Sequence, residues 1–151
     1  MNTGVFLRRL GTCAVLLFFT AVSVAEAMPT AACEKPLPND ATVVSPAAGV
    51  LPERARYSGF WVGKWDAKNC TALVVESVTE TGATVIYHSR NGSWRASAEF
   101  GDRGDLRFSL VDGKACANFA YRIRPEDGRL VGTFKRCWKQ AISLAELSRE
   151  E

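Results

Sequence analysis

The sequence predicts an all-β protein: one up-and-down antiparallel β-barrel or meander of seven or eight strands, after a cleaved signal peptide and an irregular leader. Two observations carry this prediction. From residue 59 to residue 147 the chain is a series of short stretches in which apolar and polar residues alternate, which is typical of strands with one buried face. Turn signals rich in glycine, aspartate and asparagine separate these stretches, so consecutive strands are expected to form hairpins.

Residues 1–27 have the features of a signal peptide. Two arginines precede an apolar run that ends near Ala25-Glu26-Ala27, a small-x-small cleavage site. The run is shorter than the roughly 20 residues of a membrane span. We therefore expect a secreted or periplasmic protein with no integral membrane segment in the mature chain. A retained membrane anchor is the alternative interpretation.

The mature chain is expected to be nearly neutral. Cleavage removes two arginines and one glutamate from the 19 basic and 16 acidic residues, which leaves a net charge of +2. That balance gives no reason to expect nucleic acid or an anionic membrane as a partner. The chain has one histidine, no C-x-x-C pair and no evident nucleophile beside a base. We therefore expect no metal, no cofactor and no enzymatic activity.

The leader is expected at residues 28–58, which hold five of the six prolines and follow neither a strand nor a helix period. We predict irregular chain, fixed to the barrel through Cys33 and helical for one turn near 52–57. The barrel is expected over residues 59–147, with a polar tail at 148–151.

The first strand is expected at Gly59–Trp65, where Trp61, Gly63 and Trp65 share one face. We interpret both tryptophans as structural residues that plug one end of the barrel.

The direction of Glu76 depends on how the first two strands pair. If Trp65 pairs with Cys70, Glu76 points into the barrel and needs a polar partner or a ligand there. A one-residue bulge, or an inward set of Leu73 and Val75, would instead leave Glu76 in water. With Glu76 inside, an outward apolar patch would need the leader or a partner protein as cover; this patch comprises Phe60, Val62, Leu73, Val75 and Ile86.

Turn chemistry predicts four further pairings. X-Gly dipeptides at 91–92 and 112–113 indicate two-residue hairpin turns, residues 125–128 a four-residue turn, and residues 101–105 a longer loop. The predicted pairs include Tyr87 with Ala96, Phe108 with Ala117, Phe100 with Leu106, and Tyr121 with Gly132.

These four registers agree on which face of the sheet is apolar, and a slip of one residue in any of them would destroy that agreement. The polar face excludes an outer-membrane barrel, whose outward face is apolar. The expected inward residues are Ala83, Val85, Tyr87, Trp94, Ala96, Ala98, Phe100, Leu106, Phe108, Leu110, Ala117, Phe119, Tyr121, Ile123, Leu130 and Phe134. The expected outward residues are Arg95, Ser97, Glu99, Arg107, Ser109, Asn118, Arg122, Thr133 and Lys135.

Four cysteines remain after cleavage, as in many exported domains with two disulfides. The hairpin at 125–128 places Cys116 opposite Cys137, close enough to bridge. Cys33 is then left for Cys70, although the other two connectivities stay open.

Two further segments have competing interpretations. Residues 139–147 alternate weakly and favour an eighth strand, but Ser143 and Glu146 also fit a helix capping box. His88 falls on the outward face, opposite Arg95 in the predicted register, where we expect a surface histidine.

The stretch Gly59-Phe60-Trp61 resembles the G-x-W signature of the calycins, the lipocalin-like and avidin-like barrels, and Gly63-Lys64-Trp65 repeats it. The sequence is also similar to small exported bacterial domains with the same opening. This resemblance covers about residues 57–147, and it implies a β-barrel without indicating a ligand.

The functional prediction is a non-enzymatic binding module for a small, partly apolar ligand. Tyr87, Trp94 and Tyr121 would form the walls of the site, and Glu76 its polar anchor. The alternative is a secreted interaction protein, such as an inhibitor of a protease or another hydrolase, whose partner is a protein.

Overall fold

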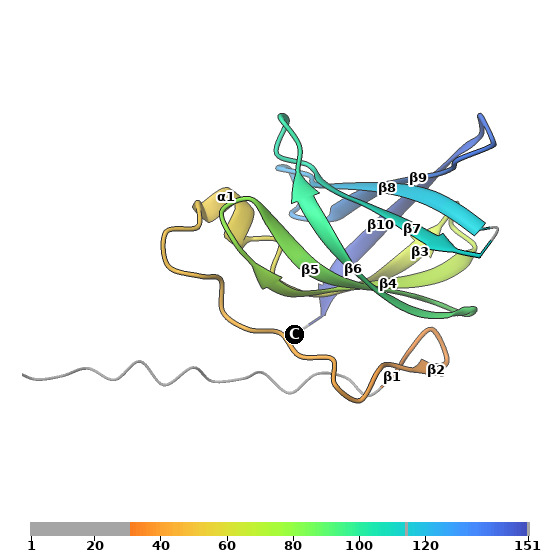
Figure 1. The fold of residues 1–151 in the computed structure, drawn as a ribbon, viewed down its shortest axis with the longest axis horizontal. Helices are drawn as coiled ribbons and strands as arrows, with labels where there is room; N and C mark the ends of the chain where they lie inside the picture. Colours follow the sequence, from red (N-terminus) through yellow and green to blue (C-terminus); the bar gives the residue numbers. More distant parts are fainter. Residues whose placement is uncertain (1–30, 114, 151) are drawn as a thin grey trace, which may run out of the picture.

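The computed structural model describes residues 31–113 and 115–150, and the signal peptide predicted at 1–27 lies outside them. Eight strands form a closed barrel (Figure 1), preceded by a two-stranded hairpin and one short helix. The hairpin and helix are β1 (Ala31–Ala32), β2 (Lys35–Pro36) and α1 (Pro52–Ala55). The barrel strands are β3 (Gly59–Trp65), β4 (Asn69–Val78), β5 (Gly82–Ser89), β6 (Gly92–Phe100), β7 (Leu106–Asp112), β8 (Ala115–Ile123), β9 (Leu130–Arg136) and β10 (Ile142–Glu150).

The strands follow one another around the barrel, and β10 pairs antiparallel with both β9 and β3. The predicted up-and-down antiparallel barrel is therefore confirmed, and residues 142–150 are a strand rather than a helix. The strand continues to Glu150, so most of the tail expected at 148–151 belongs to β10. Closing the barrel gives both edges of the meander a partner.

Two of the predicted registers are confirmed, and two are shifted by two residues. Phe100 pairs with Leu106 and Tyr121 with Gly132, as expected. In contrast, Tyr87 pairs with Trp94, because the turn after β5 lies one residue earlier than the Asn-Gly pair. Side chains alternate with a period of two, so a shift of two residues leaves each of them on its predicted face.

The register predicted for the first two strands was wrong by one residue. Trp65 pairs with Asn69, and Lys64 pairs with Cys70. Leu73 and Val75 therefore belong to the interior cluster. The ladder between β4 and β5 is irregular between Val75 and Ser77, which resets the alternation at Glu76.

Glu76 lies on the outside of the barrel, but it is not in water. Its side chain is largely covered by the leader, with residue exposure of only 8%. Arg95 Nε donates to Glu76 Oε2 at 2.7 Å, and Arg95 Nη1 donates to Asp40 in the leader at 2.9 Å. The backbone N–H of Thr42 donates to Glu76 Oε1 at 3.3 Å. Glu76 thus holds the leader against the barrel wall, and the interpretation in which it points into the barrel was wrong.

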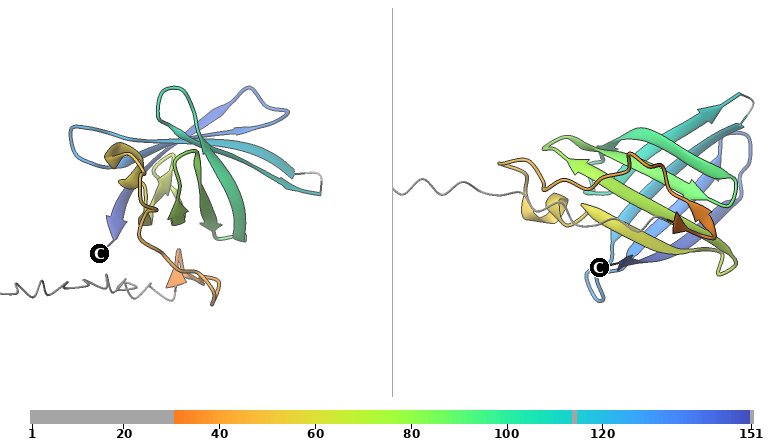
Figure 2. Two further views of the ribbon diagram at one scale, coloured as in Figure 1. Left: turned by 60° about the vertical axis from the view of Figure 1, so that its left-hand side comes forward. Right: turned by 90° about the horizontal axis from the view of Figure 1, so that it is seen from below.

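The leader crosses the outer face of β3–β5 (Figure 2, right). Leu37 and Ala32 are buried there against an outward apolar patch formed by Phe60, Ala72, Val74 and Ile86. The predicted disulfide Cys33–Cys70 attaches the leader to β4 and is confirmed. The leader therefore acts as the cover that an outward apolar patch requires.

His88 was predicted to be a surface residue opposite Arg95, and this was wrong. It pairs with Ser93 and is buried beneath the leader, with 1% exposure. Its Nε2 lies 2.8 Å from the carbonyl oxygen of Ala32, and its Nδ1 lies 2.6 Å from Ser93 Oγ. A carbonyl oxygen only accepts, so Nε2 is the protonated nitrogen in this bond.

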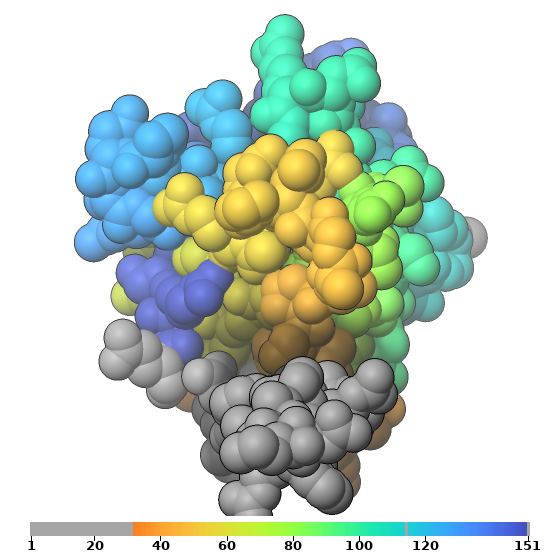
Figure 3. Space-filling view, turned by 90° about the vertical axis from the view of Figure 1, so that its left-hand side faces the viewer, coloured from red at the N-terminus to blue at the C-terminus, as the bar shows by residue number. Residues whose placement is uncertain are grey.

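One end of the barrel is closed by Tyr57, which follows α1. Its hydroxyl donates to the carbonyl oxygen of Gly104 at 2.9 Å, and its ring meets Phe100 edge-on at 5.4 Å. Trp61 Nε1 donates to the carbonyl oxygen of Tyr57 at 2.9 Å. In the space-filling view of this end, α1 and its neighbouring chain cover the face (Figure 3).

The pairing between β6 and β7 is short. Within the described chain, only Glu99↔Arg107 and Phe100↔Leu106 are in register there, whereas every other neighbouring pair in the barrel has at least six. The two strands separate toward the end opposite Tyr57, and this widens that end of the barrel.

A charged cluster at the β8–β9 turn predicts acid sensitivity. Hydrogen bonds from Arg124 lower the pKa of Asp127 to about 2, against about 3.9 in an unfolded chain, and lower the pKa of Glu146. A lowered carboxyl pKa stabilises the fold above pH 4 and loses that contribution as the pH falls toward 2. We expect the stability difference between wild type and Asp127→Asn in urea unfolding to shrink over that interval. An unchanged difference would contradict this assignment.

Candidate functional site

The open end of the barrel, opposite Tyr57, holds a pocket of about 350 Å³ that we call the mouth. It lies where β5, β7 and β9 end and β6 and β8 begin, so its walls are the inward residues at those strand ends. The lining residues are Tyr87, Ser89, Asn91, Trp94, Leu110, Asp112, Ala115, Cys116, Ala117, Phe119, Phe134, Arg136 and Trp138.

Aromatic rings form the inner wall of the mouth. Tyr87 stacks on Trp94 with ring centroids 6.1 Å apart and planes 29° apart, and it contacts Phe119 at 4.6 Å. Phe134 lies 5.2 Å from Phe119. Such rings offer apolar faces and polarised edges to a ligand.

Trp65 lies in the interior beside this wall and holds Tyr87 in place. Its Nε1 donates to the Tyr87 hydroxyl at 3.2 Å, and its ring packs 5.7 Å from Phe134. Burial raises the pKa of Tyr87, so its hydroxyl stays protonated at neutral pH and remains able to donate.

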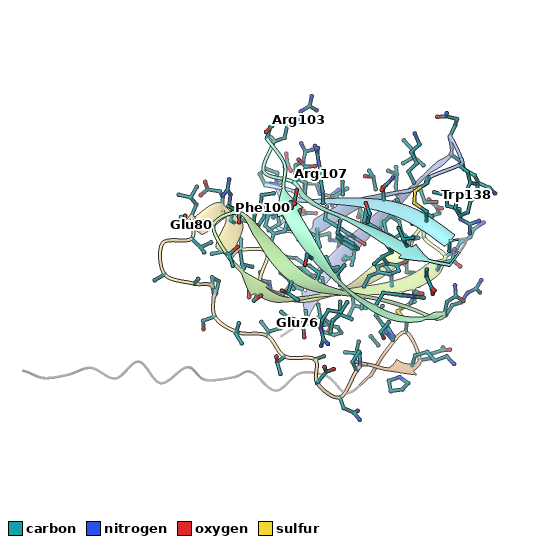
Figure 4. All side chains as sticks on the ribbon, viewed as in Figure 1. Glu76, Glu80, Phe100, Arg103, Arg107 and Trp138 are labelled. Atoms are coloured by element: carbon teal, nitrogen blue, oxygen red, sulfur yellow. A yellow bond between two sulfur atoms is a disulfide. The ribbon has the colours of Figure 1, made fainter. Side chains whose placement is uncertain are left out.

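The rim of the mouth is polar and tied by a disulfide. Asp112 Oδ2 accepts a hydrogen bond from Trp94 Nε1 at 3.3 Å. Cys116 and Cys137 form the second predicted disulfide, which is confirmed and joins β8 to the chain after β9. Trp138 follows it and is 57% exposed at the end of the barrel remote from Phe100 (Figure 4).

The structure separates the four residues that sequence patterns assigned to ligand binding. Tyr87 and Trp94 line the mouth. Tyr121 lies deeper, fully buried, and its hydroxyl has no hydrogen-bond partner among the described residues. Burial raises its pKa well above the ordinary tyrosine value. Glu76 lies outside the barrel, under the leader (Figure 4).

Trp61 and Trp65 were predicted to plug the same end of the barrel, but they lie toward opposite ends of it. Both belong to the interior cluster. Trp61 is hydrogen-bonded to the backbone of Tyr57 at the closed end, whereas Trp65 packs beside the mouth.

Sequence reasoning missed Asp112, Arg136 and Trp138. The signal for the first two was present, because the inward series on β9 runs Leu130, Gly132, Phe134 and then Arg136 at the same spacing. The series on β7 likewise ends at Asp112. Charge at a strand end was not recognised as part of the inward face.

The described residues that line the mouth offer apolar contact, hydrogen-bonding groups and one positive charge. In residues 31–113 and 115–150, no group of three or more histidine, cysteine, aspartate or glutamate side chains is placed to hold a metal ion. Within the same ranges, no helix has the length and apolar character of a membrane span. The barrel is compatible with a calycin-like fold. No family model, curated protein or solved structure matches the chain.

Proposed function

We propose that this protein is a non-enzymatic binding module that acts outside the cytoplasm and holds a small, partly apolar molecule in the barrel mouth. The observation that carries the proposal is the asymmetry of the barrel's ends. Tyr57 and α1 close one end, whereas the other is a pocket with an aromatic wall and a polar rim. Ligand pockets generally combine an apolar lining with a few polar groups in this way. The two disulfides support an oxidising compartment.

The size of the mouth fits a small ligand. Eight-stranded barrels are either filled by their own side chains or hold one small molecule. Here the part of the interior toward the closed end is filled by Trp61, Leu106 and Tyr121, each almost fully buried. The space of about 350 Å³ above them corresponds to a ligand of one or two rings.

Native mass spectrometry of the mature protein tests this proposal. We expect each wild-type chain either to carry one small molecule after purification or to bind one molecule of added N-phenyl-1-naphthylamine. Ala117→Trp places a large side chain in the mouth and is expected to abolish binding. Asn118→Trp puts the same side chain on the outer face of β8 and is expected to leave binding intact. A wild-type protein that neither carries a ligand nor binds the probe would refute the proposal.

A second candidate function, contact with a partner protein, is favoured by exposed apolar side chains outside the mouth. Ile142 and Leu144 are both 59% exposed on one face of β10, and Val111 on β7 is 74% exposed. Isolated exposed residues need no explanation, but neighbours on one strand face form a contact surface. A protein captured from culture supernatant by wild type and lost with Ile142→Ser and Leu144→Ser together would favour this candidate.

A further inference from the structure

We propose that the mouth selects anionic ligands, specifically a carboxylate or sulfonate carried on an aromatic or similar apolar ring system, and that Arg136 binds the anionic group. This inference rests on the proposed function and names the class of ligand. It follows from the position of Arg136, from the geometry of the aromatic wall, and from the lack of an ion-pair partner for Arg136 among the described residues.

Arg136 is the last residue of β9, and it has the inward position. It pairs with Ala117, just as Phe134 pairs with Phe119 two residues earlier, and all four residues line the mouth. Arg136 thus follows Phe134 on the inward face of β9, at the exposed rim of the mouth. Arg136 is also the one positively charged side chain among the described residues that line this pocket.

Among the described residues, Arg136 has no carboxylate partner within 4 Å, in contrast to the arginines that are ion-paired elsewhere on the barrel. Arg95 is paired with Glu76, Arg107 with Asp105, and Arg124 with Asp127. Those three arginines serve the fold. An arginine that lines an apolar pocket without such a partner keeps its planar array of donors available for a carboxylate or sulfonate.

Asp112 on the same rim does not neutralise Arg136. The two side chains form no ion pair, and Asp112 accepts its hydrogen bond from Trp94 instead. Asp112 therefore fixes the indole ring and contributes a negative charge on the β7 side of the mouth. A ligand anion is drawn toward β9, and its ring is left beside the stacked pair Tyr87 and Trp94.

Two fluorescent probes with the same ring system separate the contribution of charge to the binding affinity from the contribution of apolar contact. The first, 8-anilinonaphthalene-1-sulfonate, carries an anion, and the second, N-phenyl-1-naphthylamine, lacks it. We expect Arg136→Gln to weaken the binding of the sulfonate roughly five- to tenfold while leaving the neutral probe within about twofold of wild type. Asp112→Asn keeps an acceptor for Trp94 and removes a like charge, so it is expected to tighten sulfonate binding alone. Added salt is expected to weaken the binding of the sulfonate and to leave the binding of the neutral probe unchanged.

Arg122→Gln is the matched control, because Arg122 is an exposed arginine on the outward face of β8, near the closed end. This substitution removes the same charge from the molecule and is expected to change the binding affinity of neither probe. If the neutral probe binds wild type and Arg136→Gln weakens both probes equally, or neither, the anion proposal is overturned while the proposed function stands. If wild type carries no ligand and binds neither probe, the proposed function itself fails. Equal losses with Arg122→Gln and Arg136→Gln would also overturn the proposal, because net charge would then explain the effect.

Discussion

Gly63→Ala is expected to destabilise the barrel by about 3 kcal/mol, at the upper end of what overpacking costs. Gly63 pairs with Leu147 where β3 meets β10, the contact that closes the barrel. A Cβ atom at Gly63 would overlap the carbonyl oxygen of Glu146 and would lie 2.7 Å from Leu147 Cα. Both are backbone atoms, so no side chain can rotate to make room. The strands must move apart, and equilibrium unfolding in guanidinium chloride measures the cost.

Gly128→Ala is the control for this experiment. Gly128 has φ +71° and no atom within 4 Å of the added Cβ, so alanine meets only the backbone penalty of the left-handed region. That penalty is about 1 kcal/mol. If Gly63→Ala loses no more stability than Gly128→Ala, the close approach of β3 and β10 is incorrect.

Removing the Cys33–Cys70 disulfide by the double change Cys33→Ser and Cys70→Ser is expected to lower the free energy of unfolding by about 4 kcal/mol. The bridge spans 37 residues, and chain-entropy estimates for loops between 15 and 100 residues run from about 3 to about 5 kcal/mol. The same change releases the amino-terminal anchor of the leader from the patch that includes Phe60, Val74 and Ile86. Guanidinium unfolding measures the first effect, and hydrogen exchange of β4 and β5 together with dye binding measures the second.

The other disulfide supplies the comparison. Cys116→Ser with Cys137→Ser removes a bridge that spans 21 residues, so the expected loss is about 3 kcal/mol. It loosens the mouth rim and leaves the leader in place. Similar exchange rates under the leader in both double variants would show that Cys33–Cys70 does not hold the leader down.

Much of the barrel could be predicted because the strand period of two is insensitive to errors of two. The turns after β5 and β7 were each assigned to the wrong pair of residues, yet Tyr87 and Phe108 still faced inward. An error of one residue, in contrast, assigns every side chain of the strand to the wrong face of the sheet. The pairing of Trp65 with Asn69, and the bulge at Glu76, reversed the interpretation of β4.

The site was harder to predict than the fold, since its residues depend on contacts between distant segments. His88 and Glu76 read as surface or ligand residues until the leader is placed over them. No local pattern encodes the position of a leader that follows no period. Arg136 and Asp112, by contrast, lie on an inward series that local alternation already defines, and only the expectation of apolar interiors concealed them.

The order of the strands has a consequence for the kinetics of folding. Seven of the eight ladders in the barrel join strands that are neighbours in the chain, so each hairpin can form by local diffusion. Only the ladder of β3 with β10 joins the two ends of the domain, and the chain must lose the entropy of a long loop before that ladder gains a single hydrogen bond. Closure of the barrel at β3–β10 is therefore the step expected to limit the folding rate, and Gly63 lies within that step.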